Sequence, residues 1–309
     1  MGNKPMKTDN LKKWEKTLAA CIRCGYCFEH CPLSKYTKWE SDTPRAKIIM
    51  AHGLLSGELE PSDYIAEKLF SCFFCKRCDA ACSSGVTLTD IFIDARKDLI
   101  EAGFNIPGTT SITNDNCADC LACVRECPHE ARSSIDKVIV TDAVKCLACG
   151  ICVEVCPAEA AHLGMDYGTS KDDLNGEISE YLKENKNAKA VVFACNWSYF
   201  PDLQSSSMET DSKKPYKTIV NMCGGRLEKE TLMEPFLHNA EGVLVACCPD
   251  GDCEHNGNEK AKANVLFVKA LLKSLDMDPE RIKLVQIKHG DKSGFQMEID
   301  TFMAKISGK

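Results

Sequence analysis

The sequence of 309 residues contains no long apolar run, and no segment approaches the roughly 18 unbroken apolar residues that a membrane span needs. Its N-terminal stretch lacks the apolar core of a secretory signal peptide, and Met6 stands where a myristoylation motif has Ser or Thr. We therefore expect a soluble, cytoplasmic protein with no direct membrane insertion.

The sequence also lacks the motifs of the common enzyme classes. No GxGxxG follows a candidate strand, and neither a Walker loop nor a nucleophile elbow is present. The charge balance is acidic, with 38 Lys and Arg against 45 Asp and Glu, so nucleic acid is not an expected partner. With no evident flavin, nickel or pterin site, no catalytic residue is predicted.

Cysteine, by contrast, is abundant. Sixteen of the 21 cysteines fall into four copies of the spacing C-x-x-C-x-x-C-x-x-x-C. This spacing is typical of the ligands of 4Fe-4S clusters. The copies comprise Cys21, Cys24, Cys27 and Cys31; Cys72, Cys75, Cys78 and Cys82; Cys117, Cys120, Cys123 and Cys127; and Cys146, Cys149, Cys152 and Cys156.

The spacing has a mechanical reason. Three thiolates two residues apart can wrap a short turn around three irons of a cube, whereas the fourth cysteine points to a neighbouring cluster. The motifs must therefore occur in pairs. A short connection separates Cys127 from Cys146, and a longer one with helical character separates Cys31 from Cys72.

Two other uses of cysteine compete with clusters. A disulfide framework needs an oxidising compartment, and usually a small secreted domain, neither of which the sequence indicates. Structural zinc in a ribbon uses two cysteines per knuckle and leaves the third and fourth cysteine of each motif unexplained. We therefore expect an electron-transfer protein in a reducing cytoplasm.

The first 105 residues are predicted to be mainly helical. Thr43 and Pro44 begin a helix that ends near Gly57, and further helices are expected over residues 61–70 and 88–102. The apolar face of the first helix consists of Ile48, Ile49, Leu54 and Leu55.

The strings CIRCGYCFEHCP, ESDTPRAKIIMAHGLLSGEL and CFFCKRCDAACSSGV resemble the helical ferredoxins typified by the C subunit of heterodisulfide reductase. The resemblance implies two 4Fe-4S clusters and an exchange of ligands between motifs. Ser83 departs from the proline that this family has after its last cysteine. Arg45 is either a solvated charge or a residue near a cluster. The implied ligand sets are Cys21, Cys24, Cys27 with Cys82, and Cys72, Cys75, Cys78 with Cys31.

A linker rich in Pro, Gly, Thr and Asn, residues 106–116, precedes a second domain expected over residues 106–170. Residues 116–163 resemble a two-cluster bacterial-type ferredoxin, with KVIVTDAVK supplying a small sheet. The resemblance implies two more 4Fe-4S clusters. Their ligand sets are Cys117, Cys120, Cys123 with Cys156, and Cys146, Cys149, Cys152 with Cys127.

Residues 171–309 change to alternating strands and helices after a polar helix at 171–185. Strands are predicted at 188–195, 217–222, 242–246 and 283–287, and helices at 228–238, 260–275 and 295–306. The fold class is therefore multidomain α+β: a helical ferredoxin, a two-cluster ferredoxin, and a small α/β domain with a parallel sheet. The remaining cysteines mostly follow strand ends, where open α/β sheets carry their sites.

The strings VVFACNWSYFPDL, VNMCGGRLEKETLMEPF and GVLVACCPDGDC resemble the delta subunit of methyl-viologen-reducing hydrogenase. This resemblance implies one 2Fe-2S cluster with the ligands Cys195, Cys223, Cys248 and Cys253. Two departures, Ser198 and Cys247, leave open whether Cys247 replaces Cys248. His255 is expected to be a surface loop residue rather than a ligand.

We therefore predict a non-catalytic relay subunit with four 4Fe-4S clusters and one 2Fe-2S cluster. The resemblances imply a complex that performs flavin-based electron bifurcation. The implied partners are a heterodisulfide reductase A-like flavoprotein, a B-like subunit, and a hydrogenase, formate dehydrogenase or other electron donor. The alternatives are an enzyme that reduces a small disulfide or thiol at its own C-terminal cysteines, and a redox-sensing interaction protein.

Overall fold

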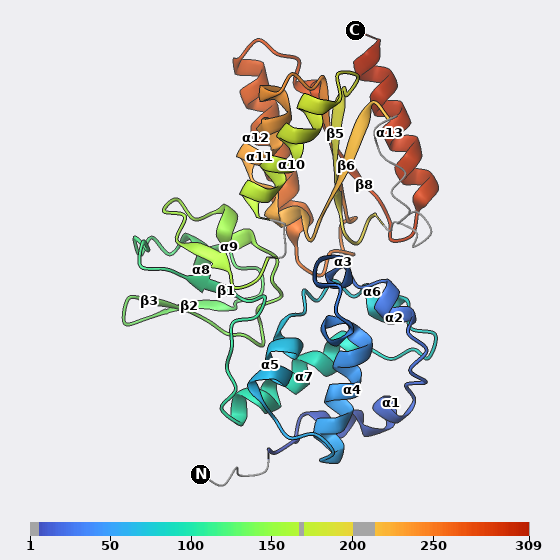
Figure 1. Cartoon of the computed structure of the whole chain (residues 1–309). Coiled ribbons are helices and arrows are strands. Elements are labelled where there is room, and N and C mark those ends of the chain that lie inside the picture. The colour runs from blue at the N-terminus through green and yellow to red at the C-terminus, as the bar shows by residue number, and fades with distance from the viewer. Residues whose placement is uncertain (1–5, 167–169, 200–213, 309) are drawn as a thin grey trace. The chain divides into compact units, whose positions relative to one another are not determined.

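The computed structural model of the chain describes residues 6–166, 170–199 and 214–308 (Figure 1). The start of the N-terminal stretch and residues 200–203 of the third resemblance lie outside the described residues. The chain divides into two compact units, Met1–Ala148 with Val155–Tyr167, and Cys149–Glu154 with Gly168–Lys309. In the described part of the chain, no helix combines the length and the apolarity that crossing a bilayer requires.

The first unit begins with a group of helices whose boundaries follow local signals. Thr43 is extended and precedes Pro44, and Gly57 ends the helix α4 in a left-handed conformation. The Ser62 hydroxyl accepts the Ile65 amide at 3.3 Å and caps α5. The helices are α1 (Glu15–Ala19), α2 (Tyr26–Glu29), α3 (Leu33–Thr37), α4 (Pro44–Ser56), α5 (Asp63–Phe70), α6 (Arg77–Ala80) and α7 (Leu88–Glu101).

The helices α4, α5 and α7 enclose an apolar core. Ile48 of α4, Leu69 of α5 and Phe92 of α7 are all buried in it. The predicted apolar face of α4 is wrong at Ile49, which is 39% exposed. The reason is geometric, because Ile49 lies about 100° around the helix from Ile48 and faces away from the core.

Two small antiparallel sheets complete the first unit. The strand β3 (Val138–Thr141) pairs with β2 (Arg132–Ile135), and β1 (Ser111–Thr113) pairs with β4 (Ala161–Leu163). Asp136 and Lys137 both have positive φ and form the two-residue turn between β2 and β3. The sequence predicted the strand within KVIVTDAVK but not its three short companions. The short helix α8 (Ala122–Arg125) precedes β2.

The second unit contains a parallel sheet of four strands in the order β6-β5-β7-β8, which confirms the predicted parallel sheet. All residues of β5 and β7 are buried, as expected for central strands covered on both faces. The strands are β5 (Ala190–Cys195), β6 (Tyr216–Asn221), β7 (Gly242–Cys247) and β8 (Ile282–Gln286).

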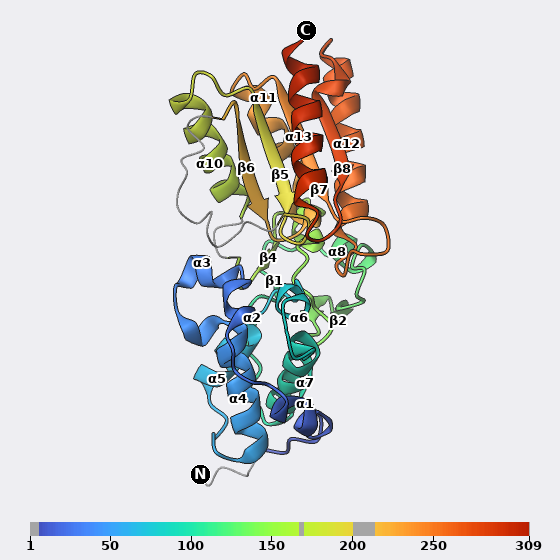
Figure 2. The same cartoon turned by 90° about the vertical axis from the view of Figure 1, so that its right-hand side faces the viewer.

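Helices cover both faces of this sheet (Figures 1 and 2). Ile178 of α10, Leu232 of α11 and Val268 of α12 pack on one face, and Phe302 of α13 packs on the other. The covering helices are α10 (Lys171–Glu184), α11 (Lys229–Leu237), α12 (Gly257–Ser274) and α13 (Lys292–Ser307), and the short helix α9 (Ile151–Glu154) belongs to the fourth cysteine motif. All predicted helices of this region are present.

Candidate metal centres

The four cysteine motifs share one backbone conformation. In each motif the residues two and four positions after the first cysteine have positive φ, and a helix of four residues follows. These residues are Arg23 and Gly25, Phe74 and Lys76, Asp119 and Leu121, and Ala148 and Gly150.

Six of these eight residues are not glycine, although a left-handed conformation costs an ordinary residue about 1–2 kcal/mol. Strain of this kind persists where a site requires it. Turns that alternate right- and left-handed residues direct backbone N–H groups to one side and create a concave surface for an anion. The loops are therefore suited to a negatively charged group such as a thiolate-bound cluster.

The last cysteine of three motifs has a common turn of its own. The amide of the residue four positions later donates to the cysteine sulfur, from Val86 to Cys82 at 3.3 Å, from Ala131 to Cys127 at 3.3 Å, and from Ala160 to Cys156 at 3.2 Å. The turn at Cys82 keeps this bond although Ser83 replaces the usual proline. Cys31 differs, because α3 begins two residues after it.

One cavity in the first unit brings together the first three cysteines of the motif that begins at Cys21 and the last cysteine of the motif that begins at Cys72. Cys21, Cys24, Cys27 and Cys82 line it. Burial, and then the proximity of Cys21, Cys82 and Cys24, raise the pKa of Cys27 to about 11. Arg45 also lines this cavity and pairs with Glu40 at 2.7 Å, so it lies beside a candidate cluster site.

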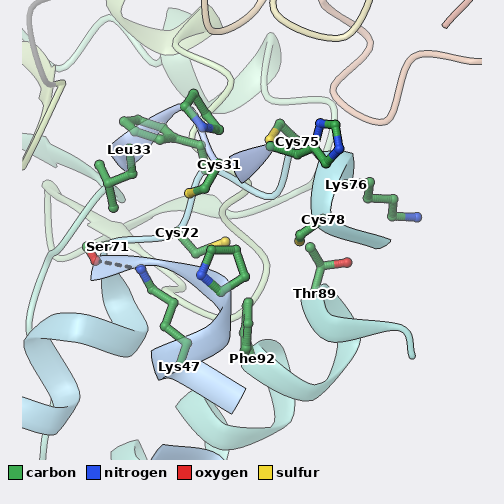
Figure 3. A pocket seen from close by; sticks show the side chains of 14 residues that line it. Cys31, Leu33, Lys47, Ser71, Cys72, Cys75, Lys76, Cys78, Thr89 and Phe92 are labelled. Atoms are coloured by element: carbon green, nitrogen blue, oxygen red, sulfur yellow. Dashed lines mark hydrogen bonds between the residues drawn. The ribbon is translucent and has the colours of Figure 1, made fainter. Parts of the chain in front are cut away.

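A second cavity contains the complementary set. Cys31, Cys72, Cys75 and Cys78 line it together with Lys47, as Figure 3 shows. Burial raises the pKa of Cys75 to about 12. The Lys47 side chain reaches this cavity from α4 and donates to Ser71 Oγ at 3.0 Å and to the carbonyl of Asp42.

Lys47 is a buried lysine that sequence reasoning missed. It is only 2% exposed, and burial lowers its pKa, while the thiolates of Cys72 and Cys31 act in the opposite direction. A lysine inside a helix ordinarily faces water, and no pattern in the sequence distinguishes Lys47 from such a residue.

The third cysteine set also lies within the first unit. Burial raises the pKa of the Cys123 thiol, the nearby Arg132 lowers it, and Cys156, Cys117 and Cys120 raise it further. The structure therefore places Cys156 beside Cys117, Cys120 and Cys123, the first three cysteines of their motif. Arg132 is buried and donates to the hydroxyls of Ser111 and Thr113.

The fourth predicted set is divided between the two units. Cys127 and Cys146 belong to the first unit, whereas Cys149 and Cys152 belong to the second. Cys146, Cys149 and Cys152 are all buried. Their assignment to one cluster with Cys127 stays a prediction from the sequence.

The C-terminal site gathers four cysteines at the carboxyl edge of the parallel sheet. Cys195 ends β5, Cys223 follows β6, Cys248 follows β7, and Cys253 precedes α12. Cys195 Sγ and Cys248 Sγ are 3.5 Å apart, and Cys253 forms hydrogen bonds with both Cys248 and Cys223. A side chain at Gly257 would collide with Cys223 Sγ, so this glycine makes room for the sulfur.

The hydrogen bonds also perturb these thiols. The bond from Cys223, and then that from Cys248, hold the pKa of Cys253 well below its usual range. The Cys248 pKa is raised, first by its bond to Cys195 and next by its bond to Cys253. Four sulfurs linked in this way form a compact donor set, and soft thiolates select iron-sulfur clusters, Zn or Cu(I).

Two other residues of this region, Cys247 and His255, are also buried. Cys247 is the last residue of β7 and packs with Cys195 and Cys248, and burial raises its pKa to about 12. The expectation that His255 is a surface residue is wrong, since it is 8% exposed. Its neighbours Glu254 and Asn256 are exposed, so only His255 turns inward here, where the backbone amides of His255 and Asn258 donate to Cys253.

The donor chemistry of the first two cavities fits a cluster. Each is lined by four thiols and a buried or half-buried cation, a suitable lining for a group with negative charge. Within residues 6–166, 170–199 and 214–308, no three Cys, His, Asp or Glu side chains are arranged to hold a single metal ion.

Comparison with known families identifies three matching segments. Residues 17–86 and residues 109–157 each match a 4Fe-4S dicluster domain. Residues 190–308 match the family described as methyl-viologen-reducing hydrogenase, delta subunit. These matches confirm the three resemblances noted in the sequence.

Curated relatives match different parts of the chain. The iron-sulfur D subunit of an F420-non-reducing hydrogenase of Archaeoglobus profundus is 31% identical over 127 residues, which cover 40% of this chain and 93% of that relative. The corresponding hydrogenase protein of Methanococcus voltae is 28% identical over 127 residues and 88% of its length. The A subunit of the ferredoxin:CoB-CoM heterodisulfide reductase of Methanosarcina mazei is 29% identical over 213 residues, 65% of this chain but only 25% of that relative.

Proposed function

Because the chain belongs, through its C-terminal residues, to the family of the methyl-viologen-reducing hydrogenase delta subunit, we propose that it relays electrons within a flavin-based electron-bifurcating complex. The complex resembles heterodisulfide reductase. The chain receives electrons from a donor such as a hydrogenase or formate dehydrogenase and passes them to a flavoprotein. In this proposal the chain transfers electrons and does not itself convert a substrate.

One observation carries this proposal: the same loop geometry recurs four times in the chain, which also contains a fifth, separate cysteine site. We assign four 4Fe-4S clusters to the four motifs and one 2Fe-2S cluster to the C-terminal site. When bound, an iron-sulfur cluster accepts and releases one electron at a time without transferring atoms. A chain with five such centres is suited to conducting electrons from one partner to another.

The residues of the chain have three tasks in this function. The cysteines hold the clusters, and the backbone amides of residues such as Val86 and Ala160 donate to their sulfurs. The apolar core excludes water. The buried cations Lys47 and Arg132 offset negative charge and thereby favour the reduced state of the nearest cluster.

The partners in the proposal come from the relatives. The A subunit of heterodisulfide reductase and the D subunit of a hydrogenase each match part of this chain, which supports a shared complex that joins the two functions. We propose a heterodisulfide reductase A-like flavoprotein as the acceptor, together with a protein like the B subunit of the same enzyme.

An anoxic native purification of the chain tests this function. We expect a flavoprotein and an oxidoreductase to co-purify, and the clusters to be reduced when the donor substrate is added. Isolated chain that reduces a small disulfide by itself, with no flavoprotein bound, would contradict the relay and favour the alternative enzyme.

A further inference from the structure

Arg96 is a fully buried arginine on α7 whose role the cluster assignment leaves open. Its guanidinium donates to the carbonyls of Leu69 at 3.1 Å and Phe70 at 2.9 Å. It also lies over the rings of Phe70 and Phe74, at 5.0 and 4.4 Å. These contacts hold the planar group in one orientation, in a part of the core with no access to water.

Two further bonds connect Arg96 to both halves of the first unit. It donates to the carbonyl of Cys72 at 3.2 Å and to the carbonyl of Ala143 at 3.4 Å. Ala143 comes three residues before Cys146 and is buried in the core of the helices, and Leu147 packs against the same core. The backbone around Cys146 therefore packs against the helical region beside Cys72.

The charge of Arg96 has no carboxylate partner among the described residues, since all four of its hydrogen bonds go to backbone carbonyls. A buried charge is costly unless other charges compensate it. The charges that do act on Arg96 are the thiolates of Cys72 and Cys146. An arginine guanidinium keeps its proton in proteins, so the group is a cation at neutral pH.

We propose that Arg96 links two clusters electrostatically, those ligated by Cys72 and by Cys146, and that electrons pass between the helical and two-cluster regions at this point. This inference rests on the proposed relay function. One electron leaves the reduced cluster on one side and enters the oxidised cluster on the other, and no atom or proton moves. The fixed cation stabilises the added electron on either cluster, and the shared bonds hold the two sites together.

The test is a redox titration of the full chain with its clusters, monitored by electron paramagnetic resonance. Arg96→Gln removes the charge and retains a donor, whereas Arg96→Lys retains the charge. We expect Arg96→Gln to reduce the equilibrium constant for one-electron reduction about tenfold at these two clusters, a fall of about 59 mV. The other two 4Fe-4S clusters should keep their potentials, and Arg96→Lys should restore most of the loss.

The matched control is Lys97→Gln, which removes the neighbouring charge on α7. Lys97 is half-buried and pairs with Asp94 at 2.8 Å, so its loss should leave all potentials unchanged. If the Arg96→Gln variant keeps its clusters and the reduction potentials of all four 4Fe-4S clusters are unchanged, the proposal is overturned. An equal shift of all four potentials would also overturn it, because a general structural effect would then explain the result.

A second measurement keeps the test decisive if the Arg96 variants lose their clusters. In the fully reduced unmodified chain, spin coupling should connect the clusters of Cys72 and Cys146. Cys149→Ala removes the second of these and should change the relaxation of the cluster of Cys72. Cys120→Ala removes the other cluster of the two-cluster region and should leave that relaxation unchanged.

Identical relaxation in the Cys149→Ala variant and the unmodified chain would refute the adjacency of the two clusters. This failure differs from failure of the proposed function, which would show itself in a chain without iron-sulfur clusters or without a flavoprotein partner.

Discussion

The four loop sites and the C-terminal site collect cysteines in different ways. Each loop supplies three thiols from one turn, and its conformation recurs in all four motifs. The C-terminal site takes one thiol from each of four separate segments, which the order of β6, β5 and β7 brings to one edge. The first kind of site depends on local backbone, and the second depends on the whole sheet.

This difference determines how each site responds to a change. Three ligands of a loop site remain in place when the fourth is lost, because a short turn holds them. In the C-terminal site the loss of one thiol breaks a chain of sulfur contacts that includes the 3.5 Å contact between Cys195 and Cys248. We therefore expect the largest effects at the C-terminal site.

Cys248→Ser should abolish the 2Fe-2S signal and uncouple the chain from its partner, while the four 4Fe-4S clusters remain. The reason is that Cys248 lies between Cys195 and Cys253 and contacts both sulfurs. Electron paramagnetic resonance of the reduced protein measures this loss.

Cys247→Ser is the matched control, since the sulfur hydrogen bonds of the site join Cys195, Cys248, Cys253 and Cys223, whereas Cys247 packs against Cys195 and Cys248 without being one of these four linked sulfurs. It should leave the 2Fe-2S signal nearly unchanged. The reverse result would show that Cys247 belongs to the site and that the ligand set has been rebuilt around Ser198.

A smaller but specific effect is expected from Cys31→Ser. Cys31 lines the cavity of Cys72, Cys75 and Cys78, so the variant should damage that cluster and spare the cluster of Cys21. Cys82→Ser should give the opposite pattern, because Cys82 lines the other cavity. Resolved spectra that show damage only within the mutated motif would contradict the exchange of ligands.

The two cavities of the helical region should also differ in their response to loss of charge. Lys47 is buried, whereas the Arg45 side chain is 30% exposed and paired with Glu40. Lys47→Met should lower the potential of its cluster by about 59 mV or more, a tenfold change in the reduction equilibrium, because a buried charge is weakly screened. Arg45→Met should shift its own cluster by less than half as much. Equal shifts in a redox titration would contradict this account.

The smallest effect concerns the strained loop backbone. Leu121 has positive φ and is 36% exposed, so Leu121→Gly relieves strain at little loss of packing. We expect the thermal midpoint for cluster loss to rise by about 2 °C, equivalent to about 0.5–1 kcal/mol. Ala122→Gly, at the first residue of α8, is the control and should lower the midpoint by a similar amount. Absorbance at cluster wavelengths during heating measures both.

The elements that could be predicted from the sequence were those with local signals. The helix α4 has an N-terminal Thr43, Pro44 and a closing Gly57, and the central strands β5 and β7 are unbroken apolar runs. The strands β1, β2 and β4 have three or four residues each with polar side chains such as those of Ser133 and Ser134. Tertiary pairing rather than propensity forms them, and they could not be predicted.

The candidate sites divide in the same way. The cysteine spacing predicted the four motifs, because all of the information lies within eleven residues of chain. The buried positions of Lys47, Arg96 and His255 could not be predicted, since burial depends on what packs against a residue and polar residues are usually exposed. The left-handed residues of the loops were also missed, because only two of the eight are glycine.

The most direct test of the account is the metal content of anoxically purified chain. Four 4Fe-4S clusters and one 2Fe-2S cluster together hold about 18 irons, with a matching amount of acid-labile sulfide. The account predicts this iron content and the optical and magnetic spectra of both cluster types. Purified chain with about two zinc ions, little iron and no labile sulfide would contradict it.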